Sequence, residues 1–128
     1  MTLDAFTAFC ASLPHATHVR QWGDSHVWKI GGKVFAIAGD EAGEITGVSF
    51  KVTPIAFHIL KDQPGCQGAP YMASRGMKWI QRFSDETMSD DELLTYLRDS
   101  YRLVGAGLTQ KLQKELGLSP TVPKGFPS

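Results

Sequence analysis

Residues 26–38 read HVWKIGGKVFAIA, two short apolar runs on either side of a glycine pair. β-Branched and aromatic side chains favour strands, and two glycines supply the positive φ angles of a two-residue hairpin turn. The runs 26–30 and 33–38 therefore predict two antiparallel strands joined at Gly31-Gly32. This hairpin decides the fold class, because neighbouring parts of the sequence repeat its pattern.

Similar runs lie on both sides of the hairpin, at residues 17–22 and 45–52, and turn-forming residues separate each run from it. Consecutive strands with short turns predict an antiparallel meander of three or four strands. Residues 78–83 are a further strand candidate. A glycine- and proline-rich segment at residues 65–76 precedes them and is predicted to be a connecting loop.

The N-terminal segment has the pattern of an amphipathic helix over residues 3–13. Thr2 can cap it, apolar residues recur at helical spacing, and Pro14 ends it. A second, short helix is predicted from Thr53-Pro54, because threonine suits the N-cap and proline the first helical position.

The C-terminal part predicts the longest helix, with an apolar stripe that continues to Leu116. Ser89 and Glu92 have the spacing of a capping box, in which each side chain bonds to the other residue's backbone. Gly105 and Gly107 weaken its middle, so we expect either a break or close packing against another backbone there.

The length and the order of these elements predict one α+β domain over residues 1–117. Residues 118–128 hold three prolines without apolar periodicity, and we expect a flexible tail. The chain has 13 basic and 13 acidic residues, which argues against strong nonspecific DNA binding. The charge is uneven, however: residues 45–84 carry a net +4 and residues 85–99 a net −5.

The sequence has no motif of a known catalytic centre. GxSxG, HExxH, a P-loop and GxGxxG are all missing, so we expect neither an enzyme nor a bound cofactor. His15 and His18 come shortly after Pro14, which favours a loop, so they are interpreted as exposed loop residues. His26 and His58 are interpreted as isolated histidines without a metal-binding partner. The acidic residues near position 90 are explained by helix capping, so no metal site is predicted.

The two cysteines, Cys10 and Cys66, form no metal-binding or redox motif. We expect reduced thiols and a cytoplasmic protein, since the sequence shows no signal peptide and no apolar run long enough to cross a membrane. By default we expect a monomer.

Residues 71–82 interleave aromatic, basic and small polar side chains, a combination that nucleic-acid binders use for stacking and phosphate contacts. Two registers are open for the strand. In one, Trp79 fills the core while Lys78 and Arg82 face water, and in the other Trp79 faces outward. On the preceding strand, alternation places Lys51 opposite Phe50, so Lys51 should be exposed.

Four motifs occur in an order that resembles the MmcQ/YjbR family of small bacterial proteins, and the resemblance covers residues 1–116. They are GGKVFA at 31–36, VSFKVTP at 48–54, Tyr71-Met72 followed by Lys78-Trp79-Ile80, and SYRLV at 100–104. One position departs from the family pattern, which commonly has histidine immediately before the tryptophan. Lys78 at this position could still make a cationic contact.

The resemblance implies a fold like that of the frataxin homologue CyaY. In this fold an antiparallel sheet carries the N- and C-terminal helices on one face and leaves the other face largely open. It also implies the label of a DNA-binding protein of the double-wing type. Iron binding of the frataxin kind is not expected, because the first helix offers only Asp4 where an acidic ridge would be needed.

The leading hypothesis is a non-enzymatic DNA-binding protein that uses the open sheet face and the loop 65–76. Phosphate contacts are assigned to Lys51, Arg75, Lys78 and Arg82, and stacking or apolar contacts to Trp79 and Tyr71. So few cations predict weak, salt-dependent binding. The alternative is a protein-interaction or small-ligand-binding module, which would show an apolar pocket near Trp79 and Tyr71 rather than a basic stripe.

Overall fold

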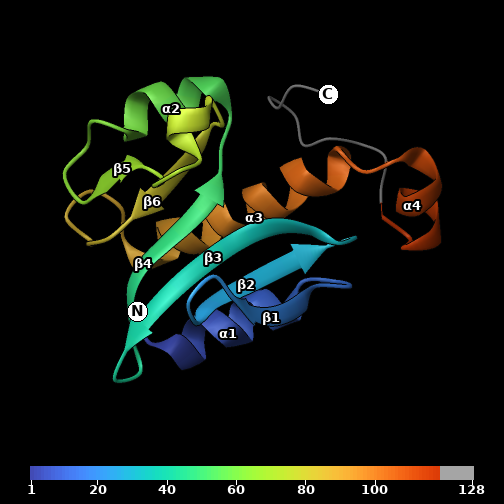
Figure 1. Cartoon of the computed structure of the whole chain (residues 1–128), viewed down its shortest axis with the longest axis horizontal. Helices are drawn as coiled ribbons and strands as arrows, with labels where there is room; N and C mark the ends of the chain where they lie inside the picture. Colours follow the sequence, from blue (N-terminus) through green and yellow to red (C-terminus); the bar gives the residue numbers. More distant parts are fainter. Residues whose placement is uncertain (119–128) are drawn as a thin grey trace.

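The computed structural model describes residues 1–118 and shows an open antiparallel sheet with helices (Figure 1). Most of the predicted tail, residues 119–128, lies outside the described part of the chain. The elements follow in the order α1 (Leu3–Ser12), β1 (Thr17–Gln21), β2 (Ser25–Ile30), β3 (Lys33–Glu41), β4 (Glu44–Lys51), α2 (Pro54–Leu60), β5 (Cys66–Gly68), a 3₁₀ turn η1 (Ala73–Arg75), β6 (Trp79–Arg82), α3 (Asp90–Ala106) and α4 (Gln110–Glu115).

The predicted hairpin is present at the centre of the meander. Ile30 pairs with Lys33 across Gly31-Gly32, and both glycines have positive φ angles. The six strands are arranged in the order β1-β2-β3-β4-β6-β5, so β6 pairs with β4 after a long excursion of the chain. That excursion corrects one expectation: residues 65–76 are not purely a loop, because they contain β5 and η1.

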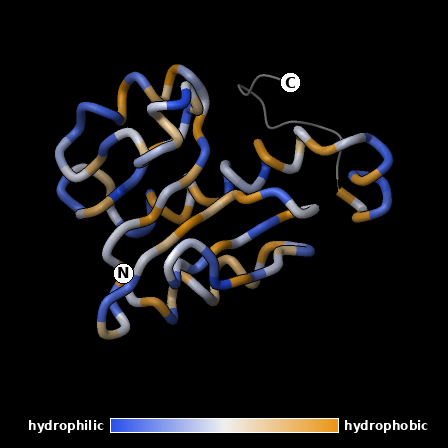
Figure 2. The backbone as a smooth tube through the Cα atoms, viewed as in Figure 1, coloured by the Kyte–Doolittle hydropathy of each residue, from blue (hydrophilic) through white to orange (hydrophobic). Residues whose placement is uncertain are grey.

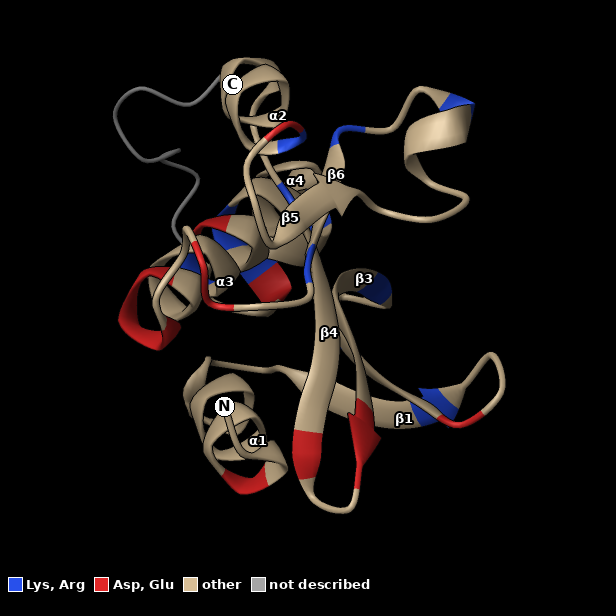
Figure 3. Ribbon diagram, turned by 90° about the vertical axis from the view of Figure 1, so that its left-hand side faces the viewer, with Lys and Arg blue, Asp and Glu red and all other residues tan. Residues whose placement is uncertain are grey.

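One face of the sheet carries the hydrophobic core. Trp28, Ala36, Phe50 and Ile80 are register partners on neighbouring strands, and all four are buried. Helices α1 and α3 lie on this side of the sheet (Figure 3). Their buried residues, such as Phe6, complete the core.

The C-terminal helical region is interrupted near the two glycines. Helix α3 starts at the predicted capping box of Ser89 and Glu92 and ends at Ala106. Gly107 caps it, and α4 begins three residues later behind the N-cap Thr109. Of the two expected outcomes, a break or close packing against another backbone, the structure therefore shows the break.

Apolar and hydrophilic residues alternate along the strands and helices, and several connecting segments are strongly hydrophilic (Figure 2). Within residues 1–118, none of the helices has the length and hydrophobicity required to cross a membrane.

Candidate binding groove on the open sheet face

A groove of about 620 Å³ lies on the face of the sheet opposite α1 and α3. Its lining comes from the open faces of several strands, from the β1–β2 hairpin and from the segment between β5 and β6. The lining residues are Trp22, Ser25, Ile37, Ser49, Pro70, Tyr71, Met72, Arg75, Met77 and Gln81.

The floor of the groove is a row of register partners on three adjacent strands. Ile37 on β3 faces Ser49 on β4, and Ser49 faces Gln81 on β6. The side-chain oxygen Oε1 of Gln81 accepts a hydrogen bond of 2.7 Å from the side-chain Nε2 of Gln67 on β5. The floor thus offers an apolar patch with a hydroxyl and an amide at its side.

Two segments form the walls, and both project from the sheet on the side away from α1 and α3 (Figure 3). One is the β1–β2 hairpin, with Trp22 in its turn, and the other is the η1 segment, with Tyr71 just before it. The two side chains are 62% and 84% exposed. Both residues also have positive φ angles, 50° for Trp22 and 68° for Tyr71.

Positive φ is unfavourable for bulky side chains and costs on the order of 1–3 kcal/mol per residue. Such conformations persist where the surrounding structure holds them, and they concentrate at functional sites. Two exposed aromatic residues with this strain, on segments about fifty residues apart, face one groove. No packing requirement explains their exposure.

The wall that carries Tyr71 is held by its own hydrogen bonds. The Ser74 hydroxyl donates to the Tyr71 carbonyl at 2.7 Å, and the Met77 amide donates to the Met72 carbonyl at 3.0 Å. At its start, the Ala69 amide donates to the Trp79 carbonyl at 2.9 Å. These bonds preorganise the segment, which lowers the entropy cost of binding a ligand.

Of the predicted phosphate contacts, the structure brings only Arg75 into the groove lining, where it joins Tyr71. Lys51 lies half-buried on the groove side of β4, opposite Trp79 in register. Lys78 is also half-buried, and its ammonium lies 4.9 Å from the centre of the Phe57 ring on α2. Both lysines border the groove region without lining it.

For Trp79 the structure selects the outward register of the two considered, but it corrects the expected exposure of the side chain. Trp79 lies on the same side of β6 as Gln81, away from the core, yet it is only 4% exposed. Because it is buried, Trp79 cannot stack on a ligand in this conformation. Its backbone instead anchors the start of the Tyr71 segment.

Arg82 is a second correction, since it faces the helices rather than water and is 5% exposed. Its guanidinium donates two bonds to the Met88 carbonyl, at 3.2 and 2.9 Å, and one of 2.8 Å to the Asp90 carboxylate. This hydrogen bond from Arg82 lowers the pKa of Asp90, although partial burial opposes the shift. Arg82 is therefore a structural cation and not a phosphate contact.

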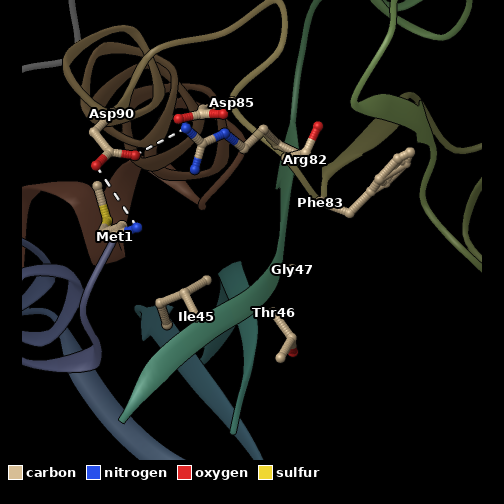
Figure 4. A pocket seen from close by; sticks show the side chains of 9 residues that line it. Met1, Ile45, Thr46, Gly47, Arg82, Phe83, Asp85 and Asp90 are labelled. Atoms are coloured by element: carbon tan, nitrogen blue, oxygen red, sulfur yellow. Dashed lines mark hydrogen bonds and ion pairs between the residues drawn. The ribbon is translucent and has the colours of Figure 1, made fainter.

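A smaller cavity of about 100 Å³ lies beside this ion pair (Figure 4). The Met1 amino group is 3.6 Å from the second Asp90 oxygen, so Asp90 receives a cation on each side. Both cations, Arg82 and the Met1 amino group, are therefore engaged by Asp90 within the protein.

The comparisons place the chain in a family. The family model described as YjbR matches residues 11–103, most of the chain. The chain belongs to the YjbR family. No curated protein matches this YjbR chain.

Two solved structures are similar to this YjbR chain over most of its length. Protein DR2400 of Deinococcus radiodurans, which has a DUF419 domain, is 26% identical with a TM-score of 0.78, and the match covers 99% of this chain and 96% of that one. A protein from Pseudomonas syringae is 18% identical with a TM-score of 0.63, over 81% and 99% of the two chains. The α+β fold expected from the resemblance is thereby confirmed, but neither description states a function.

The histidines require a third correction in this YjbR protein. His18 is not in a loop but on β1, and His26 is not isolated, because the two rings are hydrogen-bonded at 3.1 Å. His26 is buried and also contacts Asp40. Among residues 1–118, no group of three or more metal-binding side chains is placed to hold an ion.

Trp22 is the site residue that sequence reasoning missed most clearly. It was interpreted as the end of a strand, whereas it lies in the turn beside Gly23-Asp24. A large aromatic residue in a polar turn has no structural task, and this was the signal available. Ile37, Ser49 and Gln81 gave no such signal, because only the strand register brings them together.

Proposed function

We propose that this YjbR protein is a non-enzymatic nucleic-acid-binding protein and that its open-face groove takes a single strand of DNA. The observation that carries the proposal is the pair of strained, exposed aromatic residues, Trp22 and Tyr71, in one groove with Arg75. Aromatic rings stack on unpaired bases, and a guanidinium contacts phosphate or stacks in turn. The proposal needs no catalytic group, metal or second copy of the chain.

The shape of the surface favours a single strand over a duplex. Base edges in a duplex are reached by an element that protrudes into a groove of the DNA, and phosphates are held by several cations. Here the site is concave, and Arg82 is not available to a ligand because it is buried. A concave site with aromatic walls and a single lining cation suits unstacked bases.

The chemistry also predicts how tightly DNA is bound. Arg75 is the one cation of the lining, with Lys51 and Lys78 nearby. Few phosphates are neutralised, so the affinity should be modest and its salt dependence should correspond to about one to three ion pairs. The half-buried amide of Gln81 in the floor would supply hydrogen bonds to base edges.

Fluorescence anisotropy with a short labelled oligonucleotide tests this function. We expect the single strand to bind more tightly than the duplex of the same sequence. Trp22→Ala and Tyr71→Ala should each weaken binding roughly ten- to hundredfold, the loss of one stacked base. Arg75→Ala should weaken it about tenfold and reduce the salt slope by about one.

Lys111→Ala on α4 is the matched control, because it removes an exposed cation far along the chain from the groove lining. It should leave the affinity unchanged. If the parent binds neither form of DNA at low salt, or if the three groove variants bind as the parent does, the proposal is wrong.

A small-ligand-binding module is the second candidate, and the size of the groove favours it. A volume of about 620 Å³ lies within the usual range of ligand pockets. Ile37, Met72 and Met77 would suit a flat apolar molecule. Quenching of Trp22 fluorescence by small aromatic compounds, without binding of oligonucleotides, would support this candidate against the first.

A further inference from the structure

Three side chains on neighbouring strands form a continuous hydrogen-bonded chain on the helix-covered side of the sheet. The Asp40 carboxylate on β3 is 3.0 Å from Nε2 of His26 on β2, and Nδ1 of His26 is 3.1 Å from Nε2 of His18 on β1. Register explains the arrangement. His26 pairs with Ala38 and His18 with Trp28, so each contact is made by diagonal neighbours two residues apart along a strand.

The two histidines meet edge to edge through their nitrogens. Their ring planes differ by 21°, and the ring centres are 5.3 Å apart while the two nitrogens are only 3.1 Å apart. The facing nitrogens therefore lie between the ring centres, the geometry of an N–H···N hydrogen bond. Such a bond holds one proton, because one nitrogen must donate and the other must accept.

Protonation changes this contact in a defined order. An ionised Asp40 only accepts hydrogen bonds, so Nε2 of His26 carries a proton. One further proton can enter the pair at the free Nδ1 of His18 without disturbing either bond. A second one must occupy Nδ1 of His26, so that two N–H groups and two positive charges face each other and the bond between the rings is lost.

Few other charged groups act on this pair. Arg20 is on the same strand, and its guanidinium is 2.6 Å from Asp24 in the hairpin turn. On β2, Lys29 follows the core residue Trp28, so alternation directs it to the other face. His18 has its pKa lowered by burial first and then by the charges of His26 and Arg20.

The strand that this contact holds has little else to retain it. β1 is at the edge of the sheet and pairs only with β2. All its residues except Gln21 are exposed. Among residues 1–118, the bond to His26 is the one side-chain hydrogen bond between β1 and another strand, and the ring centres of His18 and Trp28 lie 5.1 Å apart.

We propose that His18, His26 and Asp40 form a proton-operated latch that fastens β1 at neutral pH and releases it when both histidines are protonated. Trp22 follows β1 directly, so release also displaces one wall of the groove. Only this consequence for binding rests on the proposed function. The latch itself is a property of the free protein.

Hydrogen exchange of the β1 amides, corrected for the intrinsic rate at each pH, tests the latch without any ligand. Between about pH 7.5 and 5, where histidines titrate, protection of residues 17–21 should fall, whereas protection of β4 should stay constant. The released form binds the second proton more readily than the latched form. The latched fraction should therefore fall up to about tenfold for each pH unit below the second titration.

His18→Gln and His58→Gln form a matched pair of variants. Glutamine at position 18 can donate to Nδ1 of His26 through its amide nitrogen or, once His26 is protonated, accept from it through its amide oxygen. The side-chain bond then survives protonation, so protection of β1 should become independent of pH. His58 is exposed on α2, and its replacement should leave the response of the parent. The latch is refuted if β1 of the parent keeps its protection at pH 5 or if His18→Gln loses it as steeply.

A titration of the parent by NMR covers the case in which His18→Gln does not fold. The N–H···N bond between the His18 and His26 rings should be visible as a coupling between the two ring nitrogens at neutral pH, and it should disappear together with the protection of β1 as the pH falls. A coupling that persists while β1 loses its protection would overturn the proposal.

Discussion

Arg82 is a cation that the fold uses internally. Replacing it with methionine, Arg82→Met, would leave the Met88 carbonyl without its two hydrogen bonds and Asp90 without one. We expect the free energy of unfolding in urea to fall by about 1–3 kcal/mol, the usual cost of an unpaired buried polar group. The affinity for oligonucleotide should not change, since Arg82 lies outside the groove lining.

Arg75→Met is the matched control, and it should give the inverse result. Arg75 is exposed, so its loss should alter stability by no more than about 0.5 kcal/mol while weakening DNA binding. Equal stability of Arg82→Met and the parent would contradict the structural role of Arg82.

Asp90 gives the same ion pair a pH dependence of known sign. Because Arg82 lowers the pKa of Asp90 in the folded state, the carboxylate contributes stability above its unfolded value of about 3.9. This contribution is lost as the pH falls through the folded value. Urea unfolding at a series of acidic pH values should show a shallower loss in Asp90→Asn than in the parent. A parallel pH profile in the two proteins would argue against the assignment.

At the scale of elements, the two glycines of the β2–β3 hairpin differ in the space available for a side chain. A Cβ on Gly31 would lie 2.6 Å from a methyl group of Leu108, whereas one on Gly32 would meet no atom within 4 Å. Both have positive φ, so each alanine variant carries backbone strain of about 1 kcal/mol. Gly31→Ala should lose additional stability because it must displace Leu108, which lies in the break between α3 and α4.

Thermal unfolding of the two alanine variants measures this difference directly. Gly32→Ala serves as the control for backbone strain alone. If both variants melt at the same temperature, the close approach between the hairpin and Leu108 contributes nothing to stability.

The local sequence pattern predicts the helices and strands. It does not predict the orientation of several side chains. The glycine pair and the capping box are decided by residues close in sequence, and both predictions are confirmed. Of the two outcomes expected near Gly105 and Gly107, the structure shows the break. The sides occupied by Trp79 and Arg82 depend on how β6 pairs with β4 across about thirty residues. No periodicity in a four-residue strand specifies that pairing, so the sequence leaves the side of Trp79 open and wrongly predicts an exposed Arg82.

Pairing between distant strands also explains why the groove and the latch were missed. Gln81 joins Ser49 and Ile37, and His18 joins His26 and Asp40, only once the registers of the sheet are known. Tyr71 and Arg75 were predicted as site residues because they are close in sequence, and the structure places both in the groove. Whether they bind DNA stays a prediction.

At the scale of the whole molecule, one buried hydroxyl group in the core links the helix layer to the sheet. The Ser100 hydroxyl on α3 donates to the Phe35 carbonyl on β3 at 2.6 Å and accepts from the Lys51 amide at the end of β4 at 2.9 Å. Ser100 is fully buried, so its hydroxyl satisfies two backbone groups of the sheet from within the protein.

Ser100→Ala should therefore lower the free energy of unfolding by about 1–3 kcal/mol although it removes only one oxygen atom. Ser12→Ala is a suitable control, because the Ser12 hydroxyl makes a single exposed bond within its own helix. Because Ser100 joins the helix layer to both central strands, its loss should reduce hydrogen-exchange protection of β3, β4 and α3 together rather than locally. Protection lost in α3 alone would show that the helix and the sheet unfold separately.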